Sequence, residues 1–350
     1  MLNAEASWDT MPLMKTLRVG IVGAGAIVRD RHAPGLAALP EVEIVAVANS
    51  TTESARHFVE NRGLNAGVVA DWRELVSRLD LDIVWIGAGP FLHEPVTLAA
   101  LEAGHHVFCQ ARMSTDLASA RRMLEAAQKR PDLVTMLCPP PHGLREDAFV
   151  KKLLADGCVG TVHSLRLRSW NGAFRDPAQP LHWRQRPEIS GKNILTLGIH
   201  TEVLQRWFGS FHVCAAAGRV LVPQHAGQSV TVPDELVVIA AWESGPAGVL
   251  DFSGVHAGPA EDCLMILGSD GVLKVDYLSG AITRQSPGRE PEILLPPDDL
   301  IRPWQVEADF IHAVRNPEAP RPRPDFADGV AYMEVVEEVS GLLETSLLKN

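Results

Sequence analysis

The sequence predicts an α/β protein: an N-terminal Rossmann domain with a doubly wound parallel sheet, then a C-terminal α/β domain with a large, open, mostly antiparallel sheet. Two observations indicate this. Between residues 17 and 138, short apolar runs alternate with amphipathic stretches of helical spacing, which is typical of a parallel sheet covered on both faces. After the three prolines at 139–141, several apolar runs follow one another without helices between them.

The elements of the first domain follow in regular order. Six predicted strands read LRVGIVG, EIVAVAN, GVVA, LDIVWIG, HHVFC and LVTML. The predicted helices between them read RHAPGLAAL, SARHFVEN, WRELVSRL, HEPVTLAALEAG and DLASARRMLEAAQK. We therefore assign residues 17–138 to this domain and expect residues 1–16 to be a disordered leader, with Met11 or Met14 as alternative starts.

The second predicted domain covers residues 139–350. A helix (DAFVKKLLADG), a strand (TVHSLRLRSW) and a second helix (HTEVLQRWFG) come first. Five predicted strands follow, VCAAAGRVLV, ELVVIAAW, AGVLDFSG, CLMILGS and GVLKVDY, and helices are expected at 304–315 and from 325 onward. An exposed sheet face favours a homodimer or homotetramer.

Composition narrows the function. The 350 residues carry a formal net charge of −11, which argues against nucleic-acid and anionic-membrane partners and favours a small-molecule ligand. No apolar run approaches the roughly 18 to 20 residues of a membrane span, and the leader lacks the pattern of a signal peptide. The five scattered cysteines read as reduced thiols of a cytoplasmic protein.

The end of the first predicted strand carries a glycine loop. Gly23 and Gly25, followed by Ala26 and Ile27, stand where a backbone turns tightly and approaches a pyrophosphate at a helix N-terminus. Val28 occupies the third glycine position of that motif. The alternative interpretation is a plain strand-to-helix turn, but the surrounding β-α-β pattern favours NAD or NADP.

The second predicted strand ends in Asn49 and Ser50, where NAD-binding proteins usually carry an acidic residue for the ribose. A neutral turn would accept a 2′-phosphate without repelling it, and Arg29 or Arg56 would supply positive charge. This favours NADP slightly, while an ordinary helix cap explains the same residues.

Several stretches together resemble the glucose-fructose oxidoreductase / inositol dehydrogenase / rhizopine catabolism (Gfo/Idh/MocA) family. They are GIVGAGAI, DIVWIGAGPFLHEPVTLAALEAGHHVFCQ, KKLLADGCVGTV, SGKNILTLGIHTEVLQRWFG and GSDGVLKVD, and they extend from about residue 17 over nearly the whole chain. The resemblance implies oxidation or reduction of a sugar, polyol or related carbonyl compound with NAD(P), and a second-domain sheet that lines the active site.

The same comparison exposes departures from the family. Its Glu-Lys-Pro motif is Gln110-Ala111-Arg112 here, so the lysine implied to contact the reacting oxygen is alanine. Its D-x-G-x-H-x-x-D pattern keeps the histidine, His200, and loses both aspartates, at Thr196 and Val203. The Asn-x-Arg after the last Rossmann strand has become the run from Pro139 to His142.

We therefore expect His200, at the start of a helix, to lie at the mouth of the cleft and act as the general acid/base, although a helix-terminal structural role is the alternative. Arg112 is a candidate for orienting the substrate oxygen or an anion, against a solvated helix-entry arginine. Lys192 is a further candidate replacement for the lost ammonium, against a plain surface charge.

Other residues are expected to contact the cofactor or the substrate. Gly89 and His93 follow the fourth predicted strand and Gln110 ends the fifth, where parallel strands present ligands. The His182-Trp183-Arg184 stretch is a candidate lining of the substrate pocket, although a core tryptophan is the simpler interpretation. No metal site is expected, because the histidines lack ligand spacing, and no nucleophile elbow is present.

The leading hypothesis is thus an NAD(P)-dependent dehydrogenase or reductase acting on CH–OH groups of a sugar or polyol. Two alternatives remain. Loss of the lysine and aspartates favours a catalytically degenerate nucleotide-binding sensor or partner protein. A redox-neutral lyase or glycosidase that keeps NAD tightly bound is the third possibility.

Overall fold

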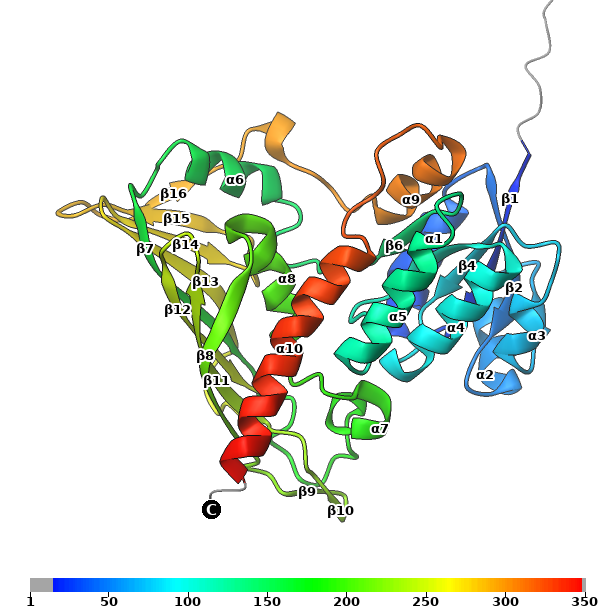
Figure 1. Ribbon diagram of the computed structural model, residues 1–350, viewed down its shortest axis with the longest axis horizontal. Helices are drawn as coiled ribbons and strands as arrows, with labels where there is room; N and C mark the ends of the chain where they lie inside the picture. The colour runs from blue at the N-terminus through cyan, green and yellow to red at the C-terminus, as the bar shows by residue number, and fades with distance from the viewer. Residues whose placement is uncertain (1–14, 348–350) are drawn as a thin grey trace, which may run out of the picture.

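The computed structural model describes residues 15–347 and has the two-domain architecture that the sequence predicts (Figure 1). Most of the expected leader lies outside the described residues. The first sheet has six parallel strands in the order β3-β2-β1-β4-β5-β6. Their bounds are β1 Leu17–Val22, β2 Val42–Ala48, β3 Gly67–Val69, β4 Ile83–Ile86, β5 His106–Cys109 and β6 Thr135–Leu137.

Helices cover this sheet, as its buried apolar strands require. They are α1 Ala33–Ala37, preceded by the π-helical turn η1 Val28–His32, then α2 Thr52–Asn61, α3 Trp72–Val76, α4 Pro90–Ala103 and α5 Leu117–Gln128. The strand order reverses direction at β1, where β2 lies on one side and β4 on the other. Ligands bind at such a switch point in doubly wound sheets.

The second sheet has eight strands in the order β16-β15-β14-β13-β7-β12-β11-β8. All neighbours are antiparallel except β7 and β12, so the expected mostly antiparallel sheet is confirmed. Its strands are β7 Val162–Trp170, β8 Phe211–Arg219, β11 Glu235–Trp242, β12 Ala247–Ser253, β13 Glu261–Gly268, β14 Val272–Asp276, β15 Ile282–Gln285 and β16 Glu292–Leu294, with a separate hairpin of β9 Gln224–His225 and β10 Gln228–Ser229.

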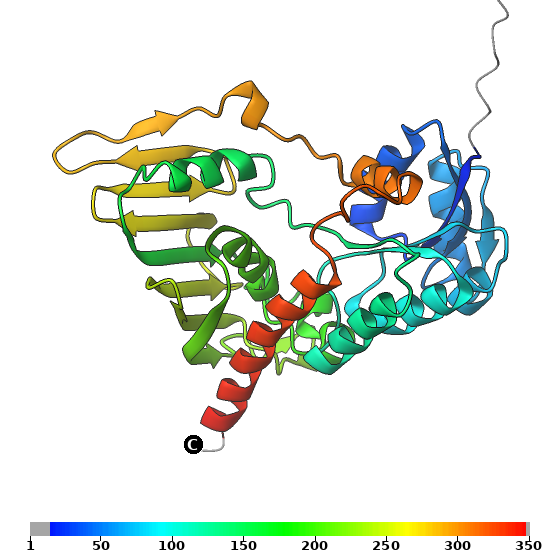
Figure 2. The same ribbon diagram turned by 45° about the horizontal axis from the view of Figure 1, so that its top comes forward.

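The helices of the second domain lie mainly on the side of this sheet that faces the Rossmann domain (Figure 2). They are α6 Asp147–Ala155, α7 Pro187–Ser190, α8 Leu197–Phe208 and α10 Phe326–Leu347, with short 3-10 turns η2 Trp183–Gln185 and η3 Asp298–Leu300. Helix α10 packs against α5 of the first domain as well as α8 and β8 of the second. It therefore joins the two domains.

Helix α9, Val306–Arg315, departs from the expected domain boundary. The sequence predicts that residues 139–350 form the second domain, but α9 contacts α1 of the first. Its buried Val306, Phe310 and Ile311 belong to the same hydrophobic cluster as β1. The chain thus returns to the Rossmann domain before α10 crosses back.

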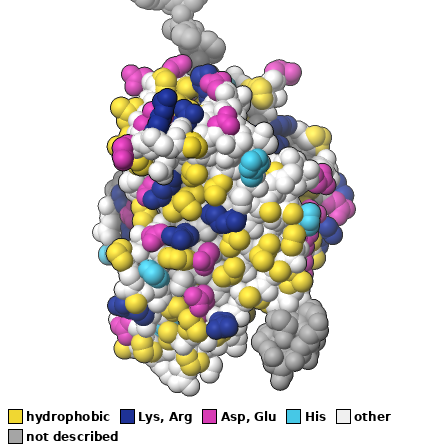
Figure 3. Space-filling view, turned by 90° about the vertical axis from the view of Figure 1, so that its left-hand side faces the viewer, with side chains coloured by type: hydrophobic (Ala, Val, Ile, Leu, Met, Phe, Trp, Pro, Cys, Tyr) yellow, Lys and Arg dark blue, Asp and Glu magenta, His cyan; other side chains and the backbone are white. Residues whose placement is uncertain are grey.

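The outer face of the eight-stranded sheet is exposed in the single chain (Figure 3). Burial alternates along β11, where Val237 and Ile239 are 37% and 46% exposed while Val238 and Ala240 are buried. Side chains alternate between faces of a strand, so one face of the sheet is core and the other is open. Among the described residues, no helix is long and apolar enough to cross a membrane.

Candidate functional site

The glycine loop after β1 has the backbone that a phosphate cradle requires. Gly23 has a φ of 89°, and a Cβ there would lie 2.3 Å from the amide nitrogen of Ala88. Gly25 is exposed, and in the described part of the chain a Cβ on it would meet only the Gly87 oxygen, at 3.9 Å. Gly23 is thus required by its positive φ and by the close approach of Ala88. Gly25 leaves open space for a pyrophosphate at a helix N-terminus.

Val28 occupies the third glycine position because the neighbouring strand compensates for it. The Cγ2 atom of Val28 lies 2.1 Å from where a Cβ on Gly87 would be. Val28 is fully buried in the core, and Gly87, at the end of β4, gives it room. In the usual motif the helix supplies the glycine of this helix–strand contact. Here the strand end supplies it, as Gly87, and the helix supplies Val28.

The turn after β2 supports the glycine loop directly. The Asn49 Oδ1 atom accepts a hydrogen bond from the Ala24 amide at 3.2 Å, which leaves the Asn49 amide group as a donor. Thr51 caps α2 together with Ser54. Of the arginines that the sequence offered for a 2′-phosphate, Arg29 forms an exposed pair with Asp30 at 2.8 Å.

Gln110, at the tip of β5, is held inside the protein. Its Nε2 atom lies 2.9 Å from His32 Nε2, and its Oε1 accepts from the Ala111 amide. His32 Nδ1 in turn lies 2.5 Å from a carboxylate oxygen of Glu307 on α9. Since both amide atoms have protein partners, the structure gives Gln110 a role in fixing the strand tip rather than the expected free contact with the cofactor.

His93, the second expected cofactor contact in this region, is also an internal residue. Its ring is fully buried, with Nδ1 2.8 Å from the Arg112 carbonyl and Nε2 2.9 Å from the Ala88 carbonyl. Burial lowers the pKa of this histidine. His93 therefore connects the loop after β4 to the loop after β5. Gly89, at the start of α4, is needed because a Cβ would lie 2.9 Å from Ile189 of α7.

Arg112 is not the solvated helix-entry arginine that was the alternative interpretation. Its side chain is only 2% exposed, and its Cδ lies 3.0 Å from where a Cβ on Gly198 would be. Burial, with the nearby charge of Arg184, lowers the pKa of Arg112 to about 9. The contact with Gly198 brings the tip of β5 against the start of α8.

Lys192 lies elsewhere than expected. Its ammonium pairs with Glu337 of α10 at 2.5 Å, and its backbone amide donates to the Thr115 carbonyl at 2.7 Å. The side chain thus points toward the helix that joins the domains. We find no support in this position for Lys192 as the replacement of the lost lysine.

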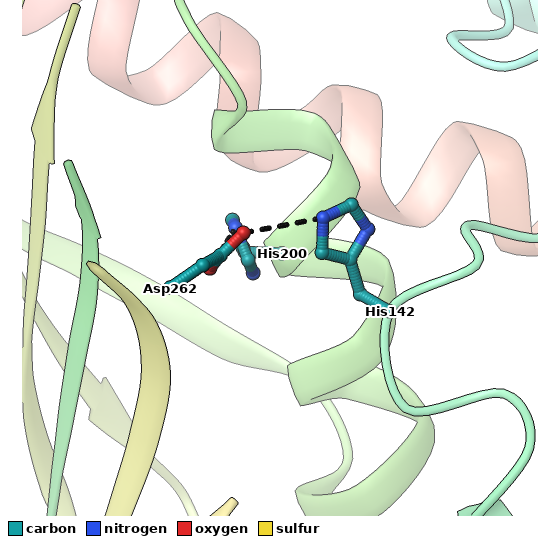
Figure 4. Close-up of side chains that lie close together, drawn as sticks. All are labelled: His142, His200 and Asp262. Atoms are coloured by element: carbon teal, nitrogen blue, oxygen red, sulfur yellow. Dashed lines mark ion pairs between the residues drawn. The ribbon is translucent and has the colours of Figure 1, made fainter. Parts of the chain in front are cut away.

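His200 belongs to a cluster that also contains His142 and Asp262 (Figure 4). Its Nε2 atom lies 3.2 Å from Asp262 Oδ1, and His142 Nε2 lies 3.3 Å from Asp262 Oδ2. His200 sits in the first turn of α8, His142 follows the three prolines, and Asp262 is on β13. Side chains from the domain boundary and from the start of α8 therefore both contact the carboxylate of Asp262 on β13.

The burial of this cluster corrects the expectation for His200. The His200 side chain is 0% exposed, so it does not lie at the mouth of a cleft, whereas the His142 side chain is 22% exposed. Burial lowers the pKa of His200, and the pair with Asp262 opposes that shift. Burial also acts to raise the pKa of Asp262, but its two histidine partners outweigh burial and hold that pKa at about 2.

A cavity of about 200 Å³ adjoins this cluster through His142. Its walls come from the loop before α8, from β7 and from the ends of neighbouring strands, with hydroxyl, amide and cationic groups among apolar ones. The lining residues are His142, Ser169, Asn171, Ala173, Phe174, His182, Arg184, Leu195, Thr196, Ile199 and Ser253. This small cavity, whose mostly apolar walls carry several polar groups, is the candidate substrate pocket.

The cluster also has the composition of a metal site. One atom from each of His142, His200 and Asp262 lies within 4.8 Å of the others, which is close enough for one ion. Histidines that bind metals almost always donate their other ring N–H to a second partner. Here the Nδ1 atoms of both histidines, His200 Nε2 and Asp262 Oδ1 are buried without a hydrogen-bond partner among the described residues. The described contacts of the cluster are therefore ion-pair distances from both imidazoles to the Asp262 carboxylate, with no second partner for either ring.

The sequence missed Asp262 as a site residue and mentioned His142 only as the end of a proline run. The two lie far from His200 along the chain, so no spacing rule could link them. The available signal for His142 was that it replaces a family motif after the last Rossmann strand. Asp262 has no local signal, because a polar residue at the start of a strand is ordinary.

Comparisons with known proteins agree with this architecture. A family model described as "Oxidoreductase family, NAD-binding Rossmann fold" matches residues 17–137, and the "GFO/IDH/MocA C-terminal domain" matches 148–274. The dTDP-3,4-didehydro-2,6-dideoxy-alpha-D-glucose 3-reductase of Streptomyces antibioticus is 30% identical over 342 residues, which cover 92% of this chain and 96% of that protein.

Two further relatives extend the comparison. Myo-inositol 2-dehydrogenase of Thermotoga maritima is 28% identical over 263 residues, covering 74% of this chain and 75% of that protein. The structure of levoglucosan dehydrogenase with NADH and levoglucosan superposes with a TM-score of 0.81 at 21% identity, covering 95% and 98% of the two chains, and this likeness concerns the fold. The expected family is confirmed: the chain belongs to the GFO/IDH/MocA family of oxidoreductases with an NAD-binding Rossmann fold.

Proposed function

We propose that the protein is an NAD(P)-dependent dehydrogenase or reductase that transfers a hydride between nicotinamide and a CH–OH or keto carbon of a sugar, polyol or related compound. The observation that carries this proposal is the His–Asp–His cluster, which adjoins a small cavity lined in part by His142. The relatives described above are dehydrogenases and reductases of inositol, levoglucosan and a dTDP-keto sugar.

The cofactor fits the loop after β1. The exposed backbone of Gly25 and Ala26 would receive the pyrophosphate, beside Ile27, and the Asn49 amide would donate to the ribose, with Ser50 next to it. The bound nicotinamide would supply or accept the hydride. The described turn after β2 offers no carboxylate, which favours NADP slightly over NAD.

The cluster is the best candidate for proton transfer to and from the reacting oxygen. His142 lines the cavity, and we assign to it the contact with substrate that the sequence gave to His200. Asp262 faces the imidazoles of both histidines, so it fixes the orientation of His142 and stabilises the positive charge that it gains. His200 then acts through Asp262 as a positioning residue.

Ala111 is the specific observation that favours a second candidate function. The family lysine is absent there, and the ammonium of Lys192 is occupied by Glu337. A nucleotide-binding protein without dehydrogenase activity would likewise lack a free lysine at this place. A redox-neutral lyase or glycosidase would instead retain its cofactor through purification.

An absorbance assay separates these functions. The purified protein is mixed with NAD⁺ or NADP⁺ and a panel of sugars, polyols and sugar acids, and absorbance at 340 nm is followed. We expect turnover of at least one compound. Binding of nucleotide with no turnover across the panel would support the degenerate protein, and product release without net absorbance change would support the redox-neutral enzyme.

We also propose that two or four copies associate through the open sheet face and that the protein works in the cytoplasm. The half-exposed Val237 and Ile239 on β11 support the first point, since contiguous apolar surface marks interfaces. The five free cysteines support the second.

A further inference from the structure

Two arginines at the candidate pocket, the buried Arg112 and the partly buried Arg184, have no acidic partner among the described residues. Arg112 is 2% exposed, and its Nε and Nη2 atoms are buried without a hydrogen-bond partner among the described residues. The Nε atom of Arg184 is also buried without a hydrogen-bond partner among these residues. Among the ion pairs of the described residues, none includes either guanidinium.

The two guanidinium groups lie close together around one indole ring. The Cζ atoms of Arg112 and Arg184 are 5.5 and 4.5 Å from the centre of the Trp183 ring. Burial lowers the pKa of both arginines, and the charge of Arg184 lowers that of Arg112 further. Cation–π contacts with the indole ring stabilise a guanidinium by less than the burial of an unpaired charge costs, so the ring does not replace an acidic partner.

The neighbouring groups do not neutralise this charge. Burial, then the charges of Arg184 and Arg112, lowers the pKa of His182 to about 4, so this ring is neutral at pH 7. Arg184 and His182 both line the cavity, together with the hydroxyl and amide groups of Ser169, Thr196 and Asn171. The lining thus combines one cation, several uncharged hydrogen-bonding groups and His142.

From this arrangement we infer that Arg184, on the cavity wall, forms an anion-binding subsite reinforced by the positive charge of the buried Arg112 behind it, and that the substrate is a monosaccharide-sized compound with a carboxylate or phosphate group. The cavity of about 200 Å³ is smaller than the usual range for drug-sized ligands, which favours a monosaccharide-sized compound. The inference rests on the proposed function, because it names the substrate class of the same pocket.

The cofactor pyrophosphate is a poorer candidate for this anion. Arg112 follows β5, whereas the glycine loop follows β1, and β4 lies between the two strands. Neighbouring strands are about 4.8 Å apart, so the strand ends are separated by roughly 10 Å. Arg184 lines a cavity built from the second domain, and no glycine-loop residue lines that cavity.

Matched ligand pairs test the inference without cofactor. Binding of D-glucose, D-glucuronate and D-glucose 6-phosphate, and of D-galactose and D-galacturonate, is measured by calorimetry. We expect at least one acid or phosphate to bind about 30-fold more tightly than its neutral partner, which corresponds to about 2 kcal/mol for a buried charge pair. The carboxylate and phosphate arms identify the source of the charge.

Variants locate the effect. Arg184→Gln should remove the preference for the charged ligand, while Arg175→Gln, at an exposed arginine of the neighbouring loop that donates to the Ala257 carbonyl, should keep it. Thermal unfolding checks that both variants are folded. Equal affinity for charged and neutral partners in every pair, or an unchanged preference in Arg184→Gln, would overturn the inference.

The outcomes also separate this inference from the proposed function. Turnover of neutral sugars at 340 nm without any preference for acids would overturn the anionic subsite and leave the dehydrogenase intact. Tight, Arg184-dependent binding of an acid without reduction of either nucleotide would support the subsite and count against the dehydrogenase.

Discussion

Replacing Asp262 by asparagine removes the charge on which the His–Asp–His cluster depends while keeping its shape. The folded protein holds the pKa of Asp262 at about 2, against an ordinary value of 3.8. At 1.36 kcal/mol per pKa unit, the ionised carboxylate contributes about 2 kcal/mol to stability at pH 7. Its side chain is only 12% exposed, so solvent screening reduces this little.

The sign of the pH dependence follows from the lowered pKa. The contribution is complete above about pH 4, where the carboxylate is ionised in both the unfolded and the folded protein, and it is lost as pH falls toward 2. We expect Asp262→Asn to unfold at lower urea concentration than wild type at pH 7. The difference in the free energy of unfolding should be about 2 kcal/mol and should shrink below pH 4.

Urea titrations followed by tryptophan fluorescence at several pH values measure this. The neighbouring Glu261→Gln is a matched control, because Glu261 forms a pair with Arg168 in which both side chains are more than 40% exposed. Such pairs contribute about 0 to 1 kcal/mol. If Asp262→Asn were as stable as wild type at pH 7, or if the difference were unchanged at pH 3, the electrostatic account of the cluster would be refuted.

Three further predictions concern other parts of the molecule. Gly23→Ala should abolish or strongly weaken NADH binding in a fluorescence titration, because its Cβ would lie 2.3 Å from the Ala88 amide at a φ of 89°; normal affinity would argue against the cradle. Ala111→Lys should raise the 340 nm rate if the pocket is a weakened family site, and an unchanged rate would mean that the cluster has replaced the lysine. Light scattering should find the proposed homodimer or homotetramer for wild type and a monomer for Ile239→Lys at unchanged thermal stability, whereas a variant that remains oligomeric would place the interface elsewhere.

The sequence predicted the architecture well because strand and helix periodicities are local signals. The glycine loop is readable for the same reason, since its function needs residues adjacent in the chain. The return of α9 to the Rossmann domain is not readable in this way. The stretch around Val306 and Phe310 has ordinary helical spacing, which does not indicate a domain. Only its packing in the hydrophobic cluster that contains the side chains of β1 shows that it covers the Rossmann domain.

Individual site residues were predicted less well, because burial and partners depend on distant segments. His200 was identified as a site residue, but its place behind Asp262 follows from the packing of α8 on β13, which no motif records. Gln110 and His93 stand at the strand ends where ligands bind, yet carbonyl and imidazole partners hold both inside the protein. The ammonium of Lys192 pairs with Glu337, which lies 145 residues later in the chain on α10, so no local pattern could reveal this contact.

The most direct test of the central claim compares wild type with His142→Ala on the best substrate of the 340 nm panel. We predict that kcat/KM falls at least about 100-fold, as expected for loss of a general acid/base, while the Kd for NADH stays unchanged. Equal kcat/KM values for the two proteins would contradict the assignment of proton transfer to the cluster that His142 presents to the cavity.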